Sequence, residues 1–386
     1  MHAIEKILAN HAGKKAVAAG EIVTAKVDFA EINDLYLQTL YSFWEMGGER
    51  VWDNSRVAFV FDHYAPAPTI QSADIHTKMR AFAKDQGLVH HFDVNAGVCH
   101  QVMPEAGVIT PGSIVVATDS HTTTHGAFGA FGTGVGATDM ATILMTGELW
   151  FRVPEIIEIR LEGTPPAGVY PKDVILHVLG VIKADGAVYK GVEFSGSYVE
   201  SLGVAGRMVI CNMAVEMGAK TAYMKPNREV LDYVAARAVR PFEAVESDPD
   251  YVFSERHVFD LSAMEPQIAV PDSVDNVRPI GEAGEVAVNQ GYIGTCTGGR
   301  TEDLAEAARI LRGKRLAPFV RLIVIPASRA VMEECLEKHY IQDLMAAGAT
   351  ISTPGCGPCL GAHEGAVAPG EVCITASNRN FPGRMG

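Results

Sequence analysis

The 386-residue sequence has no apolar run long enough to cross a membrane and no apolar segment near its start. Charged residues interrupt the first 23 positions, namely Glu5, Lys6, Lys14, Lys15 and Glu21. A membrane-spanning helix needs a run of about 18 or more apolar residues, and a signal peptide needs an apolar core. Neither segment is therefore expected, and no membrane partner is predicted.

An excess of basic residues is also absent. The chain has 32 Lys and Arg against 46 Asp and Glu, and its formal charge is −14. This balance argues against nucleic acid or an anionic membrane surface as the main partner. If the substrate is an anion, a few placed cations must hold it against the overall charge.

Neither a short internal repeat nor a low-complexity tract is present, and the hydrophobic content of 48% is ordinary for a globular protein. A domain size of roughly 150 residues predicts two to three domains. The odd number of cysteines, seven, argues against a disulfide framework and predicts reduced thiols in the cytoplasm.

Short apolar runs rich in β-branched residues alternate with longer helical patterns, which predicts an α/β fold with mostly parallel sheets. The predicted strands cover residues 57–61, 114–117, 156–161, 292–293, 322–325 and 372–375. The predicted helices cover residues 72–86 with Ser72 as N-cap, 137–146, 204–217, 227–236, 301–311 and 328–338. Residues 240–279 are predicted as a linker or extended crossover, with a weaker break at 161–171.

Three cysteines lie on glycine-rich turns. Cys356 and Cys359 form a C-x-x-C turn, and Cys296 lies in a second turn at residues 294–299. Glycines let the backbone wrap a bulky group and leave N–H groups free to bond thiolate sulfurs. The glycine-rich loop continues after Cys359, which argues against a thioredoxin-like dithiol. Two interpretations remain: a zinc site closed by His363, or an iron–sulfur cluster with one open, Lewis-acidic iron.

The other cysteines are expected to be structural, because free cysteine is usually a small buried hydrophobe. They are Cys99, Cys211, Cys335 and Cys373.

A second group of residues suits acid–base chemistry, and several of its members directly follow predicted strands, where ligands of parallel sheets gather. A carboxylate behind an imidazole fixes the tautomer and raises the pKa of the imidazole. His90 and His91 are interpreted instead as satisfied core or surface residues. The candidate acid–base residues are Asp62, His63, His100, Asp119, His121 and Glu193.

A glycine-rich run at residues 126–137 leads into a helix. The residues before it are polar, and a dinucleotide fingerprint requires a strand there. Close packing of the backbone around the site is the favoured explanation.

The last motif is a polar turn near the C-terminus that contains Asn378, Arg379 and Arg384. Arginines on such a turn bind carboxylates through paired, charge-assisted hydrogen bonds. The alternative is a solvated tail, and the carboxylate interpretation is favoured.

Together these motifs resemble the aconitase superfamily, most closely the large-subunit branch of 3-isopropylmalate dehydratase and homoaconitase. The resemblance extends over essentially the whole chain. It implies three α/β domains with mostly parallel sheets around a central cleft, at residues 1–162, 163–278 and 279–386. The motifs that carry it are residues 117–126 (ATDSHTTTHG), 294–303 (GTCTGGRTED), 354–361 (PGCGPCLG) and 377–384 (SNRNFPGR).

The resemblance also implies site residues. A [4Fe-4S] cluster is expected on Cys296, Cys356 and Cys359. The expected pairs are Asp62 with His63, Asp119 with His100, and Glu193 with His121. The expected substrate contacts are Ser120, Asn378, Arg379 and Arg384.

The implied chemistry is dehydration and rehydration of a 2-hydroxy di- or tricarboxylic acid. The first expectation is interconversion of 2- and 3-isopropylmalate in leucine biosynthesis. Homoaconitate and methylmalate or citraconate substrates stay open, since Gly298 stands where many relatives have asparagine. A zinc-stabilised, non-catalytic α/β binding protein is the alternative of another class.

The resemblance further implies a partner. In single-chain aconitases the catalytic base is a serine in a mobile C-terminal domain, and this sequence ends at Gly386 before any such domain. A separate small subunit that carries the swivelling domain and the base is therefore expected.

Overall fold

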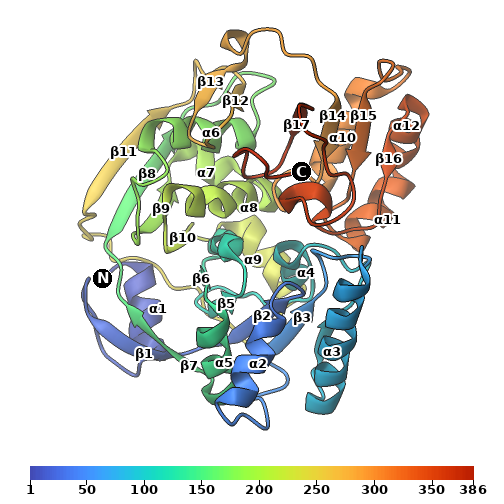
Figure 1. The fold of residues 1–386 in the computed structure, drawn as a ribbon. Coiled ribbons are helices and arrows are strands. Elements are labelled where there is room, and N and C mark those ends of the chain that lie inside the picture. Colours follow the sequence, from blue (N-terminus) through green and yellow to red (C-terminus); the bar gives the residue numbers. More distant parts are fainter.

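The computed structural model describes residues 1–386 and contains three parallel sheets (Figure 1). The first sheet has five strands in the order β4-β3-β2-β5-β6. Its strands are β2 (Phe29–Asn33), β3 (Val57–Val60), β4 (His90–Phe92), β5 (Ile114–Ala117) and β6 (Phe131–Gly134). The helices of this segment are α1 (Ala3–His11), α2 (Leu37–Glu45), α3 (Ile70–Gln86), α4 (Cys99–Glu105), η1 (Ser120–Phe128) and α5 (Ala137–Thr146).

The second sheet has four parallel strands in the order β10-β9-β8-β11. Its strands are β8 (Ile156–Glu162), β9 (Gly191–Ser195), β10 (Thr221–Tyr223) and β11 (Glu255–Asp260). Its helices are α6 (Pro171–Ile182), α7 (Ser197–Ser201), α8 (Val204–Asn212), η2 (Met213–Met217) and α9 (Arg228–Ala235).

The third sheet has four parallel strands in the order β16-β15-β14-β17 and lies at the right of Figure 1. Its strands are β14 (Gln290–Ile293), β15 (Arg321–Val324), β16 (Thr350–Ile351) and β17 (Cys373–Thr375). Its helices are α10 (Thr301–Leu311), α11 (Arg329–Glu337), α12 (Tyr340–Ala347) and η4 (Gly357–Leu360).

Two antiparallel pairs complete the fold. One joins β1 (Ile22–Lys26) to β7 (Glu148–Arg152), and the other joins β12 (Gln267–Ala269) to β13 (Val277–Pro279), after which η3 (Ile280–Glu282) follows. None of the helices combines the length and the apolar character needed to cross a bilayer.

The predicted α/β class with mostly parallel sheets is confirmed. Helices α5 and α10 have the predicted bounds, and β5 does as well. The predicted N-cap of the first long helix is wrong: the helix begins at Ile70, with Thr69 as N-cap and Ser72 as the third residue of a capping box. Both residues carry hydroxyls, so the composition alone does not distinguish the cap from its partner.

The predicted linker at residues 240–279 is also wrong in part, since it contains β11 and the β12–β13 hairpin. In β11 only Phe259 is buried, so this edge strand shows no apolar run in the sequence. It forms because its backbone pairs with β8.

The division into domains at 1–162, 163–278 and 279–386 stays a prediction. Strand β8, which ends at the first of these boundaries, pairs with β9 and β11 of the following segment. One apolar cluster also joins residues of the first two segments, for example Phe128 and Met213.

Candidate active site

A cavity of about 330 Å³ lies where the first and third sheets present the carboxyl ends of their strands. Neighbouring strands β3, β2 and β5 are followed by Asp62, Asp34 and Asp119. From the third sheet, β14 leads to Cys296 and β17 leads to Asn378. Of the acid–base, substrate-binding and cluster-ligand residues predicted from the sequence, all except Glu193 line this cavity.

His63 is held by two carboxylates, those of Asp62 and Asp34. Its Nδ1 lies 2.6 Å from Asp62 Oδ1, and its backbone N–H donates to Asp34 Oδ1 at 3.0 Å. The other oxygen of Asp62 accepts from the N–H of Cys99. Burial lowers the pKa of His63, but interactions with Cys356 and with the carboxylates of Asp62 and Asp34 raise it more, so its pKa lies well above the usual value.

A second group is centred on Asp119. Its Oδ1 lies 3.1 Å from His100 Nε2 and accepts from the N–H of His121 at 2.7 Å, while Oδ2 is 3.7 Å from His63 Nε2. Burial raises the pKa of Asp119, but its bonds to His100 and His121 hold the pKa well below the usual value. An ionised carboxylate therefore stands among three imidazoles.

The predicted pairing of Glu193 with His121 is wrong. His121 Nε2 lies 2.7 Å from Glu216 Oε1. Glu193 lies on β9 and its carboxylate instead bonds Nε2 of His2, the N-cap of α1. Successive side chains of a strand point to opposite faces, and that of Glu193 points away from the cavity toward α1.

Glu216, the partner of His121, also orients the guanidinium of Arg379. Arg379 Nε lies 2.9 and 3.1 Å from the two oxygens of Glu216, and its Nη2 donates to Ser120 Oγ at 3.0 Å. Burial raises the pKa of Glu216, but His121 and Arg379 lower it below the usual value. Arg379 is thus oriented before any ligand binds.

Arg384 contributes a second cation to the cavity wall. Its Nε is buried and has no acceptor in the protein. Since an unpaired buried donor is costly, this nitrogen fits a ligand that brings a carboxylate.

The three cysteines predicted as ligands lie together on the cavity wall. Cys296 and Cys356 pack in one cluster with Val98 and Cys359. Asn378 Nδ2 donates to Cys296 Sγ at 3.3 Å, and the Tyr292 hydroxyl donates to the carbonyl of Cys356 at 2.9 Å. Three thiols from two turns, with an N–H donor aimed at one sulfur, fit the ligand set of an iron–sulfur cluster.

His363 does not join these cysteines. Its Nε2 bonds the carbonyl of Pro66, and it does not line the cavity. The donor atoms of Asp62, His63 and Cys356 lie within 4.8 Å of one another, and His363 is not among them. The zinc site of three cysteines closed by His363 therefore finds no support in the geometry.

Sequence reasoning missed three residues of the site. Asp34 accepts hydrogen bonds from His63, Tyr64 and His76. Burial raises the pKa of its carboxyl, but these bonds lower the pKa below the usual value. Asn212 Oδ1 accepts from Asn378 Nδ2 at 2.5 Å, and Glu216 is the partner of His121. The spacing of four residues between Asn212 and Glu216 in a helical pattern was an available signal, because it puts both on one face.

The glycine-rich run packs closely against this site. A Cβ at Gly132 would lie 2.3 Å from the carbonyl oxygen of Thr122, and one at Gly134 would lie 2.7 Å from that of Asp119. Only glycine lets β6 approach η1 this closely. This geometry agrees with close packing and offers no dinucleotide fingerprint.

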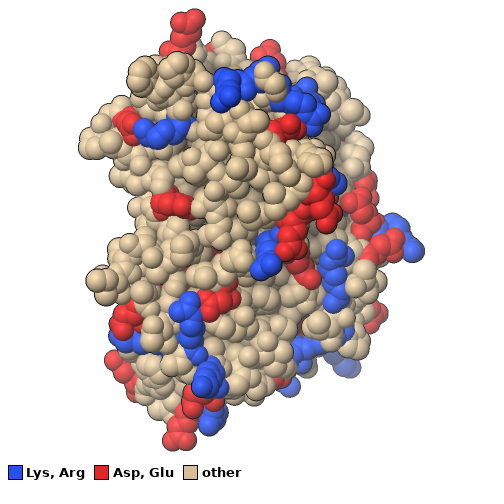
Figure 2. All heavy atoms as spheres, turned by 90° about the vertical axis from the view of Figure 1, so that its right-hand side faces the viewer, with Lys and Arg blue, Asp and Glu red and all other residues tan.

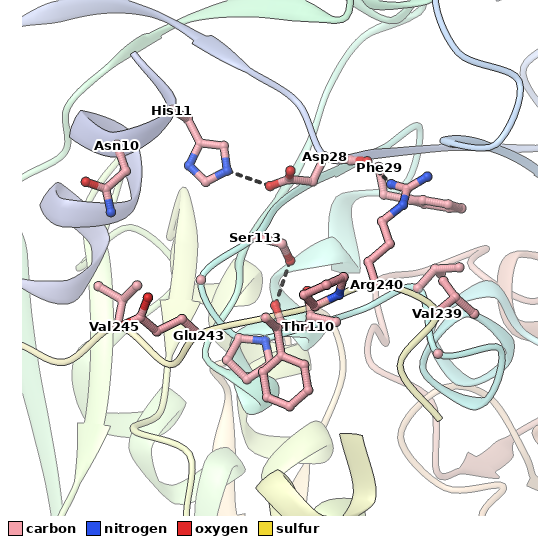
Figure 3. A pocket seen from close by; sticks show the side chains of 16 residues that line it. Asn10, His11, Asp28, Phe29, Thr110, Ser113, Val239, Arg240, Glu243 and Val245 are labelled. Carbon is pink, nitrogen blue, oxygen red and sulfur yellow. Dashed lines mark hydrogen bonds and ion pairs between the residues drawn. The ribbon is translucent and has the colours of Figure 1, made fainter. Parts of the chain in front are cut away.

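A smaller cavity of about 250 Å³ lies at the opposite, amino-terminal edge of the first sheet (Figure 3). His11 of α1 points toward Asp28, and Nε2 of His11 lies 2.6 Å from Asp28 Oδ2. Arg240, which lies in the chain between α9 and β11, donates to the carbonyl of Asp28. No predicted site residue lines this cavity, so the cavity with the cysteines is the candidate active site.

Charged side chains of both signs occur on the surface of the protein. On the face shown in Figure 2, acidic and basic side chains are interspersed and no large basic area forms.

Comparison with known proteins gives the relationships of the chain. The model of the aconitase family (aconitate hydratase) matches residues 5–285 and 281–386. A probable methanogen homoaconitase large subunit from Methanothermobacter thermautotrophicus is 51% identical over 391 residues, which cover 100% of this chain and 91% of the relative. A 3-isopropylmalate dehydratase large subunit from Methanopyrus kandleri is 50% identical over 383 residues, covering 99% of this chain and 91% of the relative.

Among solved structures, the chain is similar to aconitase X of Thermococcus kodakaraensis in its holo form, with a TM-score of 0.53. The match covers 98% of this chain and 89% of that chain, at 14% identity. This likeness supports the fold alone.

Proposed function

The chain belongs to the aconitase family, and we propose that it is the large subunit of a two-chain iron–sulfur hydro-lyase that isomerises 3-isopropylmalate and 2-isopropylmalate. One observation carries the proposal: the cysteines, the histidine–carboxylate pairs and both arginines line a single cavity. The relatives at 44–51% identity are named as large subunits of 3-isopropylmalate dehydratase and homoaconitase.

Cys296, Cys356 and Cys359 are proposed to hold a [4Fe-4S] cluster. When bound, such a cluster supplies a Lewis acid that polarises the substrate hydroxyl, because three thiolates leave one iron open. Support comes from the donor set, three thiols on one wall with Asn378 bonding the sulfur of Cys296.

His63 is proposed as the acid that protonates the departing hydroxyl. Asp62 accepts a hydrogen bond from Nδ1, so the proton available for transfer to the substrate is the one on the other ring nitrogen, Nε2. The raised pKa keeps His63 protonated near neutral pH, which a general acid requires.

Arg379 and Arg384 are proposed to bind the substrate carboxylates, with Ser120 and Asn378 beside them. Arg379 is held in place by Glu216, and Arg384 has a free Nε. Proton removal beside a carboxylate builds negative charge on the substrate, and fixed cations stabilise that charge. His100, Asp119 and His121 are proposed to complete the acid–base set.

A small subunit that carries a swivelling domain is proposed to supply the catalytic base and the remaining substrate contacts. The names of the relatives as large subunits support the partner. The purified chain alone is expected to show no dehydratase activity, whereas addition of its small subunit restores turnover. Robust turnover by the isolated chain would refute this part of the proposal.

Homoaconitate is the second candidate substrate, because a relative named as a homoaconitase large subunit is 51% identical. A panel of 2-hydroxy acids tested with the two-chain enzyme separates the candidates. A kcat/KM for 3-isopropylmalate at least about tenfold above that for homoaconitate supports the first candidate, and the reverse order supports the second.

A further inference from the structure

Lys172 stands in the first turn of α6, a helix of the second sheet, and reaches the turns that follow β14 and β17 of the third sheet. Its Nζ donates to Thr297 Oγ1 at 2.8 Å and to the carbonyl of Ala376 at 2.8 Å. We propose that Lys172 is a positioning residue that fixes the turn of Cys296 against the turn of Asn378. The inference rests on the proposed function, because these turns carry the proposed cluster ligand and substrate contacts.

The two acceptors are adjacent to the residues that matter. Thr297 directly follows Cys296, and Ala376 lies two residues before Asn378. The hydroxyl of Thr297 is buried, accepts from Lys172 and itself donates to the Ala376 carbonyl at 2.9 Å. One ammonium therefore holds both turns through a closed set of three hydrogen bonds.

The same two turns meet a second time at the cavity. There Asn378 Nδ2 donates to Cys296 Sγ at 3.3 Å and to Asn212 Oδ1 at 2.5 Å. With one connection at Lys172 and another at Asn378, the turns have little freedom to slide. The position of the Cys296 sulfur relative to the substrate turn then follows from Lys172 as well as from Asn378.

Lys172 lines a separate cavity of about 980 Å³ and not the candidate active site, so it does not reach a substrate bound among the cysteines. Its ammonium makes no ion pair with a carboxylate, and its bonds go to a hydroxyl and a carbonyl. Withdrawing an ammonium from water without a carboxylate partner is unfavourable unless hydrogen bonds compensate. An apolar side chain would fill the same space without a buried charge. The hydrogen bonds that Lys172 donates are therefore its inferred role.

The test compares Lys172→Met, which keeps the chain length and removes charge and donors, with Lys183→Met at the end of the same helix. Lys183 donates only to the carbonyl of Asp275 and serves as the matched control. Hydrogen exchange is measured at residues 294–299 and 375–379 in the purified chain without iron. Exchange in both turns is expected to be about tenfold faster in Lys172→Met and unchanged in Lys183→Met.

A second readout uses the chain reconstituted with iron and sulfide. A chelator is expected to remove iron about tenfold faster from Lys172→Met than from the wild type or Lys183→Met. In the two-chain enzyme, KM for the hydroxy acid is expected to rise more than kcat falls. Lys172→Arg, which keeps charge and donors, should recover most of the exchange protection.

Unchanged exchange in both turns of Lys172→Met would overturn the inference, as would faster exchange spread evenly over the chain. If Lys172→Met does not fold, Thr297→Val removes the shared hydroxyl and is judged by the same criteria. A wild-type chain that takes up no iron would refute the proposed function, while the exchange result still decides the role of Lys172.

Discussion

His121 Nε2 lies 2.7 Å from Glu216 Oε1, and this bond connects η1 of the first segment to η2 of the second. The same carboxylate holds Arg379 of the C-terminal turn. One side chain therefore aligns an imidazole and a guanidinium that come from distant parts of the chain.

Glu216→Gln is expected to lower kcat/KM of the two-chain enzyme by about 100-fold or more, because both His121 and Arg379 lose a charged partner. Glu193→Gln, which affects the bonds to His2 and Ser247 outside the cavity, should change kcat/KM less than about threefold and act on stability instead. Steady-state kinetics on both variants checks this. A larger loss of kcat/KM in Glu193→Gln than in Glu216→Gln would contradict this and support the pairing of Glu193 with His121.

Cys356→Ser is expected to abolish the broad brown absorbance that appears after anaerobic reconstitution with iron and sulfide. The wild type should hold about four irons per chain. Cys373→Ser is the control, because Cys373 is half-buried on β17 and does not line the cavity. One tightly held zinc and no iron in the wild type would instead favour a zinc-stabilised binding protein.

Gly126→Ala is expected to lower the free energy of unfolding by about 2 kcal/mol or more, since a Cβ there would lie 2.2 Å from the carbonyl oxygen of Ala222 on β10. Neither backbone segment can yield without breaking the hydrogen bond from the Met224 N–H to the Gly126 carbonyl. At Gly136 a Cβ meets nothing within 4 Å, so Gly136→Ala should change the free energy by less than about 1 kcal/mol. Urea unfolding of both variants measures the difference, and equal effects would contradict it.

The pair His11–Asp28 is expected to make stability depend on pH. Burial lowers the pKa of His11, but Asp28 raises it above the usual value of 6.5; burial raises the pKa of Asp28, but His11 lowers it below 3.8. The contribution is therefore full between about pH 4 and 6.5. It is lost as pH rises through the raised pKa of His11 and as pH falls through the lowered pKa of Asp28.

Asp28→Asn should accordingly cost about 2 kcal/mol of unfolding free energy at pH 5.5 and clearly less at pH 9. The control is Glu243→Gln, on the wall of the same cavity, which removes a charge without an ion-pair partner. Urea titrations at the two pH values provide the measurement. An equal loss at both would show that the charge of His11 has no part in it.

Much of this site was predictable because its signals are local. Asp62 and Asp119 directly follow short apolar strands, and the glycines around Cys296 and Cys356 mark turns. Parallel strands present their carboxyl ends at one edge, so residues far apart in sequence were expected to meet. Strand β2 was not predicted, since Glu31 interrupts its apolar pattern although the side chain is fully buried.

Periodicity and turn chemistry act over a few residues, so the α/β class, the residue types at the strand ends and the turns that carry the cysteines could be predicted from the sequence. The contact of His121 with Glu216 in place of Glu193, and the bonds of Lys172 to the turns of Cys296 and Asn378, become visible only in the folded structure. The first contact spans 95 positions and the second joins two segments of the fold. Such contacts depend on how whole elements pack, and the local spacing of residues in the sequence does not predict that packing.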